Sequence, residues 1–112
     1  MSDTFFKKIL LLPCANGTLR SQRTCMNYVA NMRILFKKMK GEVWDFNLDF
    51  FMLNAPEIGE YLIEKFKLST AQNYLSSIII SLQAHDEVVP QDYTALMKKN
   101  GEILRTESNK QT

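Results

Sequence analysis

The chain has 112 residues, of which 46% are hydrophobic and 23% are charged, and its formal net charge is +2. These values predict one globular domain with a hydrophobic core and exclude a wholly disordered chain. The two cysteines and single histidine exclude a disulfide framework and a four-ligand zinc site, and they favour a reducing intracellular compartment, nucleus or cytoplasm. No apolar run approaches the roughly 18 residues of a membrane span, so no membrane partner is expected.

Residues 1–20 are expected to form a partly ordered N-terminal arm, because their apolar run at 9–12 stops at Pro13. A helix is predicted over residues 21–40, where apolar side chains recur every three or four positions from Cys25 to Met39. Ser21 is suited to cap its N-terminus, and Gly41 to take the left-handed conformation at its C-terminus.

The aromatic-rich residues 42–53 predict a loop followed by a short helical turn. Asn54 is then expected to cap a helix that has Pro56 in its first turn and Glu57 completing a capping box. A second capping box, Ser69 to Gln72, predicts a helix over residues 69–84. This helix has no charged residue.

A last helix is predicted over residues 90–100, followed by a polar tail or linker at 101–112 whose end frays. The sequence therefore predicts an all-α bundle of four to five helices without a sheet, in which residues 21–100 form the domain. The expected core consists of Tyr28, Met32, Leu35, Phe36, Ile58, Leu62, Phe66, Tyr74, Leu75, Ile78, Ile79 and Leu82.

Charge is strongly segregated along the chain. Residues 1–40 contain eight basic residues and one acid, whereas residues 41–64 contain six acids and no base. The basic part favours an anionic partner such as nucleic acid. The alternative is that the acidic segment packs beside the basic helix and neutralises it.

The sequence offers little to catalysis. It has no glycine-rich phosphate loop. A hydrolase or transferase needs a nucleophile, a base and a residue that orients the base, and no recognisable motif of this kind includes the one histidine. Cys25 falls on an apolar stripe, and His85 is expected to cap carbonyl groups at a helix end or to face water. We therefore predict a protein that is not an enzyme and uses no cofactor, metal or small-molecule substrate.

Several segments together resemble the N-terminal core-binding (SAM-like) domain of tyrosine recombinases, the phage-type integrases, including those of viruses and mobile elements. They are Thr24, Tyr28, Met32 and Phe36 in the first helix, residues 45–51, Tyr61-Leu62, and residues 68–78 (LSTAQNYLSSI). Glutamine stands in the last segment where many members have threonine, and serine where they have alanine.

The resemblance implies a helical bundle that clamps one face of duplex DNA and catalyses nothing alone, because the family's catalytic residues lie on a separate domain. Contacts to other recombinase protomers would pass through that absent C-terminal domain. The chain would then be an excised domain or a natural remnant of a recombinase.

In this family the first and third main helices lie near the duplex. Here these helices correspond to the basic helix 21–40 and the uncharged helix 69–84. Gln72 and Asn73 have the amide groups suited to reading adenine, although Gln72 would equally complete a capping box. The predicted DNA-binding residues are Arg20, Arg23, Asn27, Asn31, Arg33, Lys37, Lys38, Ser69, Thr70, Gln72, Asn73 and Ser76.

Two other interpretations remain open. One is a helical protein–protein interaction domain with no DNA role, in which the uncharged helix 69–84 and the aromatic segment 43–53 form a docking groove. The other is a small nucleic-acid-binding protein without recombinase ancestry.

Overall fold

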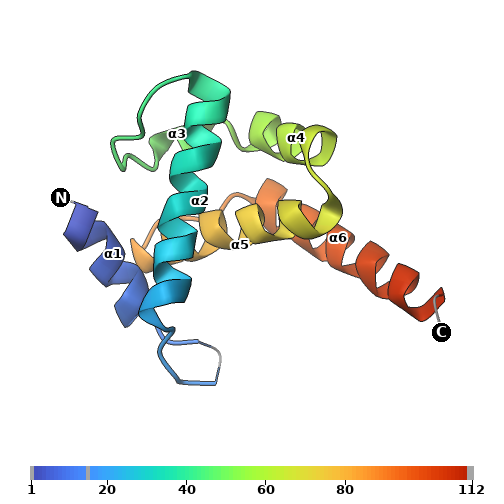
Figure 1. Ribbon diagram of the computed structural model, residues 1–112, viewed down its shortest axis with the longest axis horizontal. Coiled ribbons are helices and arrows are strands. Elements are labelled where there is room, and N and C mark those ends of the chain that lie inside the picture. The colour runs from blue at the N-terminus through green and yellow to red at the C-terminus, as the bar shows by residue number, and fades with distance from the viewer. Residues whose placement is uncertain (1, 15, 111–112) are drawn as a thin grey trace.

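A computed structural model describes residues 2–14 and 16–110, with side chains described for residues 4–14 and 16–106. Within that part of the chain the only extended pairing is an isolated bridge between Pro13 and Leu19, which confirms the all-α class (Figure 1). Six helices are described there, α1 (Ser2–Leu11), α2 (Gln22–Lys40), α3 (Asp49–Leu53), α4 (Ala55–Lys65), α5 (Leu68–Ala84) and α6 (Gln91–Lys110).

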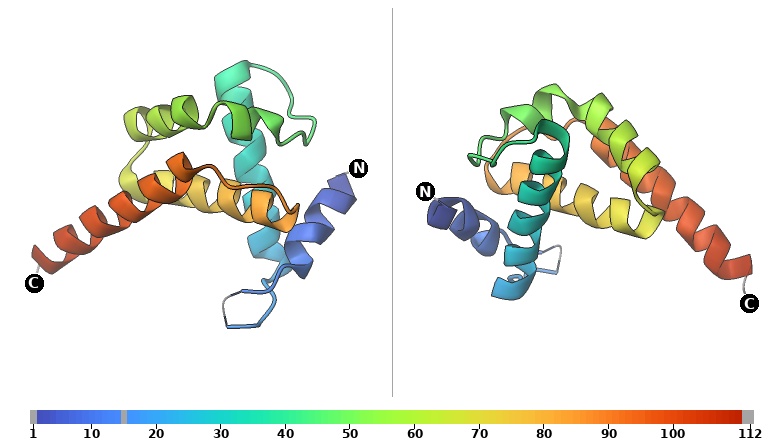
Figure 2. Two further views of the ribbon diagram at one scale, coloured as in Figure 1. Left: turned by 180° about the vertical axis from the view of Figure 1, so that it is seen from behind. Right: turned by 45° about the horizontal axis from the view of Figure 1, so that its top comes forward.

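Helix α5 lies at the centre of the fold. It packs against α2 and α6, and also contacts α1 and α4, so that neighbours surround most of it (Figures 1 and 2). Even two of its serines, Ser77 and Ser81, are buried. Small uncharged side chains let neighbouring helices approach without removing a charge from water. The absence of charge in this helix is therefore explained by burial along much of its length.

Residues 2–11 of the expected partly ordered arm form helix α1, which was not predicted from the sequence. Phe5 and Ile9, one helical turn apart, are both buried, and the helix packs on α2 and α5. A ten-residue helix is marginal by itself, so its stability depends on these tertiary contacts. Helix α1 is one reason why six helices are described where four to five helices were predicted.

The aromatic segment after α2 belongs to the core. Trp44 is 2% exposed and Phe51 is fully buried, and the Trp44 ring packs edge-on against Phe5 and Phe51 at centroid distances of 5.1 and 5.7 Å. The predicted helical turn is confirmed as α3. Because these two rings face inward, they belong to the core. Phe46 of the same segment lines a pocket with Phe5 and His85, and the alternative of a docking groove at this segment stays a prediction.

The caps of α2 are as predicted. Asn54 is the N-cap residue of α4 as expected but makes no capping hydrogen bond through its side chain, and the predicted cap of α5 is wrong. Ser21 accepts a hydrogen bond from the backbone of Thr24, and Gly41 has φ +72°. The side chain of Asn54 donates instead to the Phe50 carbonyl at the end of α3. Helix α5 begins at Leu68, which places Ser69 inside its first turn, where it is not the capping residue.

Helix α6 ends at Lys110, ten residues beyond the predicted end at residue 100, so residues 101–110 are helical where a frayed tail was expected. The last two residues of the expected tail, 111 and 112, lie outside the described part. Gly101 does not interrupt it. A Cβ atom there would lie 3.7 Å from the amide nitrogen of Gln72, so the glycine lies close to α5. No helix in the described residues is long and apolar enough to cross a membrane.

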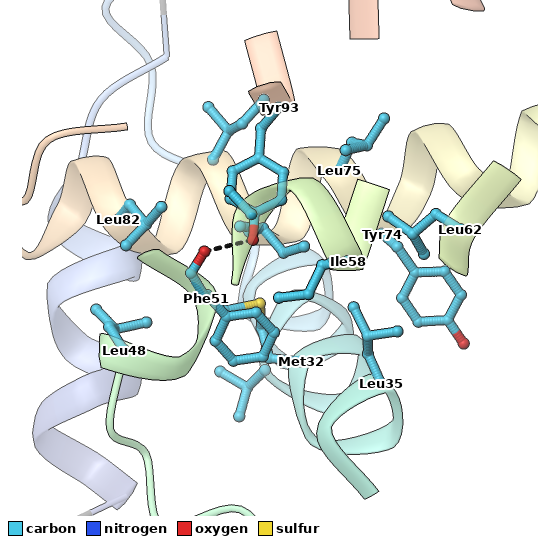
Figure 3. Close-up of a cluster of buried hydrophobic side chains, with 14 of the residues drawn as sticks. Met32, Leu35, Leu48, Phe51, Ile58, Leu62, Tyr74, Leu75, Leu82 and Tyr93 are labelled. Carbon is cyan, nitrogen blue, oxygen red and sulfur yellow. Dashed lines mark hydrogen bonds between the residues drawn. The ribbon is translucent and has the colours of Figure 1, made fainter. Parts of the chain in front are cut away.

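Most predicted core residues are buried, and Figure 3 shows part of their cluster. Tyr28, Phe36 and Phe66 are only partly buried at its edge. Tyr93 is fully buried, and its hydroxyl donates to the Phe51 carbonyl, joining α6 to α3 (Figure 3).

The first prediction concerns the packing of α5. Ile78 is fully buried, so Ile78→Ala is expected to lower the free energy of unfolding by about 2–5 kcal/mol. Ile80 on the same helix is only partly buried, and Ile80→Ala should cost clearly less. Urea denaturation followed by circular dichroism measures both, and equal losses would contradict the orientation of α5.

The second prediction concerns the hydrogen bond of Tyr93. Tyr93→Phe keeps the ring but leaves the Phe51 carbonyl without this donor, which should cost about 1–3 kcal/mol. Tyr61→Phe removes the same hydroxyl at a partly buried position and serves as the control. Urea denaturation of the two variants compares them, and a loss no larger for Tyr93→Phe would show that this bond contributes little.

Candidate nucleic-acid interface

A groove of about 430 Å³ lies between α2 and α5. It brings together five of the predicted DNA-binding residues from two helices that are distant in the sequence: Asn27, Asn31, Thr70, Asn73 and Ser76. Thr24, Tyr28 and Tyr74 complete the described lining, so hydroxyl and amide groups line it without a charge. Such groups can both donate to and accept from a ligand.

A short hydrogen-bond chain links the two walls of the groove. The side-chain amide of Asn31 donates to Ser77 Oγ at 3.0 Å, and Ser77 Oγ donates to the carbonyl of Asn73 at 2.9 Å. Asn31 is partly buried and therefore has a structural task, whereas Asn27 and Asn73 are exposed. These two amides are the ones available to a ligand.

Sequence reasoning assigned the two tyrosines of the groove to the core. Tyr74 is largely buried, and in Figure 3 its hydroxyl points away from the buried cluster. Burial raises the pKa of Tyr74, with a smaller contribution from nearby Tyr61, so the hydroxyl stays neutral. Thr24 could have been found from the sequence, because it lies three residues before Asn27 on the same helix.

The basic side chains of α2 belong to the helix that forms one wall of the groove, but they do not line it. Arg23, Lys37 and Lys38 are exposed but are absent from the groove lining. At 3.6 residues per turn, Arg23, Asn27 and Lys38 fall along one side of α2. No acidic residue occurs anywhere in this helix, so its exposed surface is cationic beside a neutral groove.

Four predicted residues have other surroundings. Gln72 neither caps α5 nor lines the groove, since its amide donates to the Met97 carbonyl of α6 at 3.0 Å. A step of about 100° along the helix separates it from Asn73. Arg20 donates to the Leu12 carbonyl at 2.8 Å, and Arg33 lies 5.8 Å from the centre of the Phe46 ring. Ser69 is exposed outside the groove lining.

The helical part of the acidic segment has its main contacts away from α2. Helix α4 packs against α5 and α6, and its Glu57, Glu60 and Glu64 are exposed. Helix α4 therefore does not cover α2. The earlier part of the acidic segment does pack beside α2, because Phe50 contacts Phe36 at a ring-centroid distance of 5.0 Å and Phe46 lies near Arg33.

The remaining candidates for chemistry have structural surroundings. Cys25 is fully buried, and burial raises the pKa of its thiol against the opposing effect of Arg20, so the protonated, unreactive form is favoured. The ring nitrogen Nδ1 of His85 donates to the Ser81 carbonyl at 2.8 Å, as expected of a residue that caps a helix end.

No protein-family model, curated protein or solved structure gave a significant match to this chain. The geometry and charge of its surface are therefore the basis for a functional assignment.

The third prediction separates the structural amide from the exposed one. Asn31→Ala removes the bond to Ser77 and should lower the free energy of unfolding by about 0.5–1.5 kcal/mol. Asn27→Ala, the same change at an exposed site of the same helix, should change it by less than about 0.5 kcal/mol. Urea denaturation of both variants tests this, and a reversed order would show that Asn31 is not held by α5.

Proposed function

We propose that this protein is a DNA-binding module that receives one face of a duplex across α2 and α5. The observation that carries the proposal is the acid-free basic surface of α2 beside a neutral groove lined by amides and hydroxyls. Cations bind phosphates at any sequence, whereas amide groups can hydrogen-bond to base edges. The two surfaces together therefore supply affinity and a means of discrimination.

The basic residues have the simpler role. Arg23, Lys37 and Lys38 are exposed side chains that can reach phosphates without a desolvation cost. Each phosphate contact releases counterions, so affinity should fall steeply with salt. The net charge of only +2 limits the number of such contacts, and we expect weak binding.

The groove residues have the more selective role. Thr70 lies in the first turn of α5, where backbone N–H groups and the helix dipole favour a phosphate, and Asn73 lies in the next turn. The exposed amides of Asn27 and Asn73 can pair with an adenine edge or with the backbone. Gln72 is assigned no contact, because its amide is bonded to α6.

We further propose that the module belongs to a site-specific tyrosine recombinase or integrase and is non-catalytic alone. The sequence resemblance supports this, since it concerns the same two helices that form the groove. Such a module would act in an intracellular compartment, nucleus or cytoplasm, and would clamp DNA together with a catalytic domain.

The first experiment measures affinity for a fluorescently labelled duplex by anisotropy. Between 50 and 200 mM salt, a handful of phosphate contacts should reduce affinity by about 10²–10³-fold. Binding that does not respond to salt, or no binding at 50 mM, would contradict the proposal.

The fourth prediction separates the two surfaces. Lys37→Ala and Lys38→Ala should each weaken binding to all duplexes alike and reduce the salt slope by about one. Asn73→Ala should leave the slope unchanged and reduce discrimination between a preferred and a scrambled duplex by about 1–3 kcal/mol.

Two variants serve as controls in the same assay. Lys65→Ala removes one exposed charge from α4, and Gln72→Ala removes an amide that faces α6. Both should bind DNA as the parent does. If Lys65→Ala weakened binding as much as Lys37→Ala, the effect would reflect net charge rather than a defined face.

A further inference from the structure

A second groove, of about 340 Å³, lies between α4 and α6 and has no part in the proposed DNA site. Its lining is mostly apolar, and includes Gly59, Ile63 and Leu96. Gly59 is buried, and a Cβ atom there would lie 3.3 Å from the Leu96 side chain, so the glycine allows α4 and α6 to pack closely. Ile63 remains 41% exposed.

Acidic side chains border this groove. Glu60 and Asp92 belong to its lining, and Glu57 is exposed one turn before Glu60 on α4. An apolar floor beside carboxylates fits a partner that presents an apolar side chain close to cations.

The outer face of α1 has those properties. Its inner side chains Phe5 and Ile9 are buried, whereas Lys7, Lys8 and Leu11 are exposed. Leu11 is 69% exposed, and it lies four and three residues after the two lysines, on the same side of the helix. An apolar side chain is thus presented next to two cations.

The two surfaces lie on opposite sides of the molecule. In all three views α1 is at one side of the fold and α4 at the other (Figures 1 and 2). The α1 surface of a chain therefore cannot occupy the groove of the same chain, but it can occupy that of a second copy.

We propose that copies of this chain associate head to tail, with Leu11 of one copy in the α4/α6 groove of the next. Lys7 and Lys8 then face Glu60 and Asp92, which pairs cations with carboxylates across the contact. The contact leaves the α2/α5 surface free, so it does not depend on the proposed DNA binding. Because the two surfaces differ, each added copy leaves one of each exposed, and association continues beyond a dimer.

The first test is sedimentation velocity at 50 mM salt, with chain concentrations up to about 1 mM because small interfaces bind weakly. We expect the average mass to rise with concentration and to fall when salt is raised. A chain that stays monomeric over the whole range would overturn the proposal.

Two variants with opposite defects test the head-to-tail arrangement. Leu11→Asp removes the α1 surface and keeps the groove, whereas Ile63→Lys blocks the groove and keeps the α1 surface. Each should be monomeric alone, with association weakened at least about tenfold, and an equimolar mixture should form a 1:1 complex that does not grow. Association of either variant alone, or no complex in the mixture, would overturn the arrangement.

A charge exchange tests the pairing of the lysines with the groove. Glu60→Lys and Lys7→Glu should each reduce self-association, and a chain that carries both should recover it. Glu64→Lys makes the same charge change on α4 outside the groove lining and should have no effect. All these sites are exposed, and circular dichroism verifies that each variant is folded. Failure of the double variant to recover, or equal loss with Glu64→Lys, would overturn the pairing.

Discussion

The structure depends on the burial of α5 on most of its sides. Helices α2 and α6 pack against it, and α1 and α4 contact it as well, so a charged side chain at most of its positions would have to leave water. Its sequence meets this constraint with aliphatic residues, small hydroxyl side chains and amides. Ser77 shows how a buried polar residue is accommodated, since its hydroxyl donates a hydrogen bond to the carbonyl of Asn73 and accepts one from the side-chain amide of Asn31.

The same constraint shapes the groove that we propose as the DNA site. Where α5 emerges from its neighbours, the exposed part of the helix is neutral, and the facing side of α2 contributes amides and a tyrosine. The exposed cations Arg23, Lys37 and Lys38 belong to α2 but lie outside the groove lining. In the proposed binding mode, affinity and selectivity would come from different side chains, which is the common division in protein–DNA interfaces.

The basic and acidic segments of the sequence form separate surfaces in the fold. The basic α2 flanks one groove, whereas the acidic α4 borders another groove beside α6. Because α4 packs on α5 and α6, its carboxylates are separated from the cations of α2 and remain exposed. A chain with a nearly balanced net charge thereby presents two faces of opposite sign, each suited to a different kind of partner.

The sequence by itself determined the helical class, the bounds of α2 and α5 to within one or two residues, the start of α4, and most of the core. These features follow from the 3.6-residue period and from Gly41, Pro56 and Ser21, whose effects are local. The same period placed Asn27, Asn31, Asn73 and Ser76 on exposed or interhelical faces.

Only the tertiary structure decided how those faces are combined. It stabilised α1 through Phe5 and Ile9, and it continued α6 through Gly101, where local signals predicted an arm and a tail. It also turned Gln72 towards α6 and Asn73 towards α2. Gln72 and Asn73 are adjacent polar residues of one helix, and local sequence signals do not tell them apart. The packing of distant helices decides which of the two side chains joins two helices and which lines the groove.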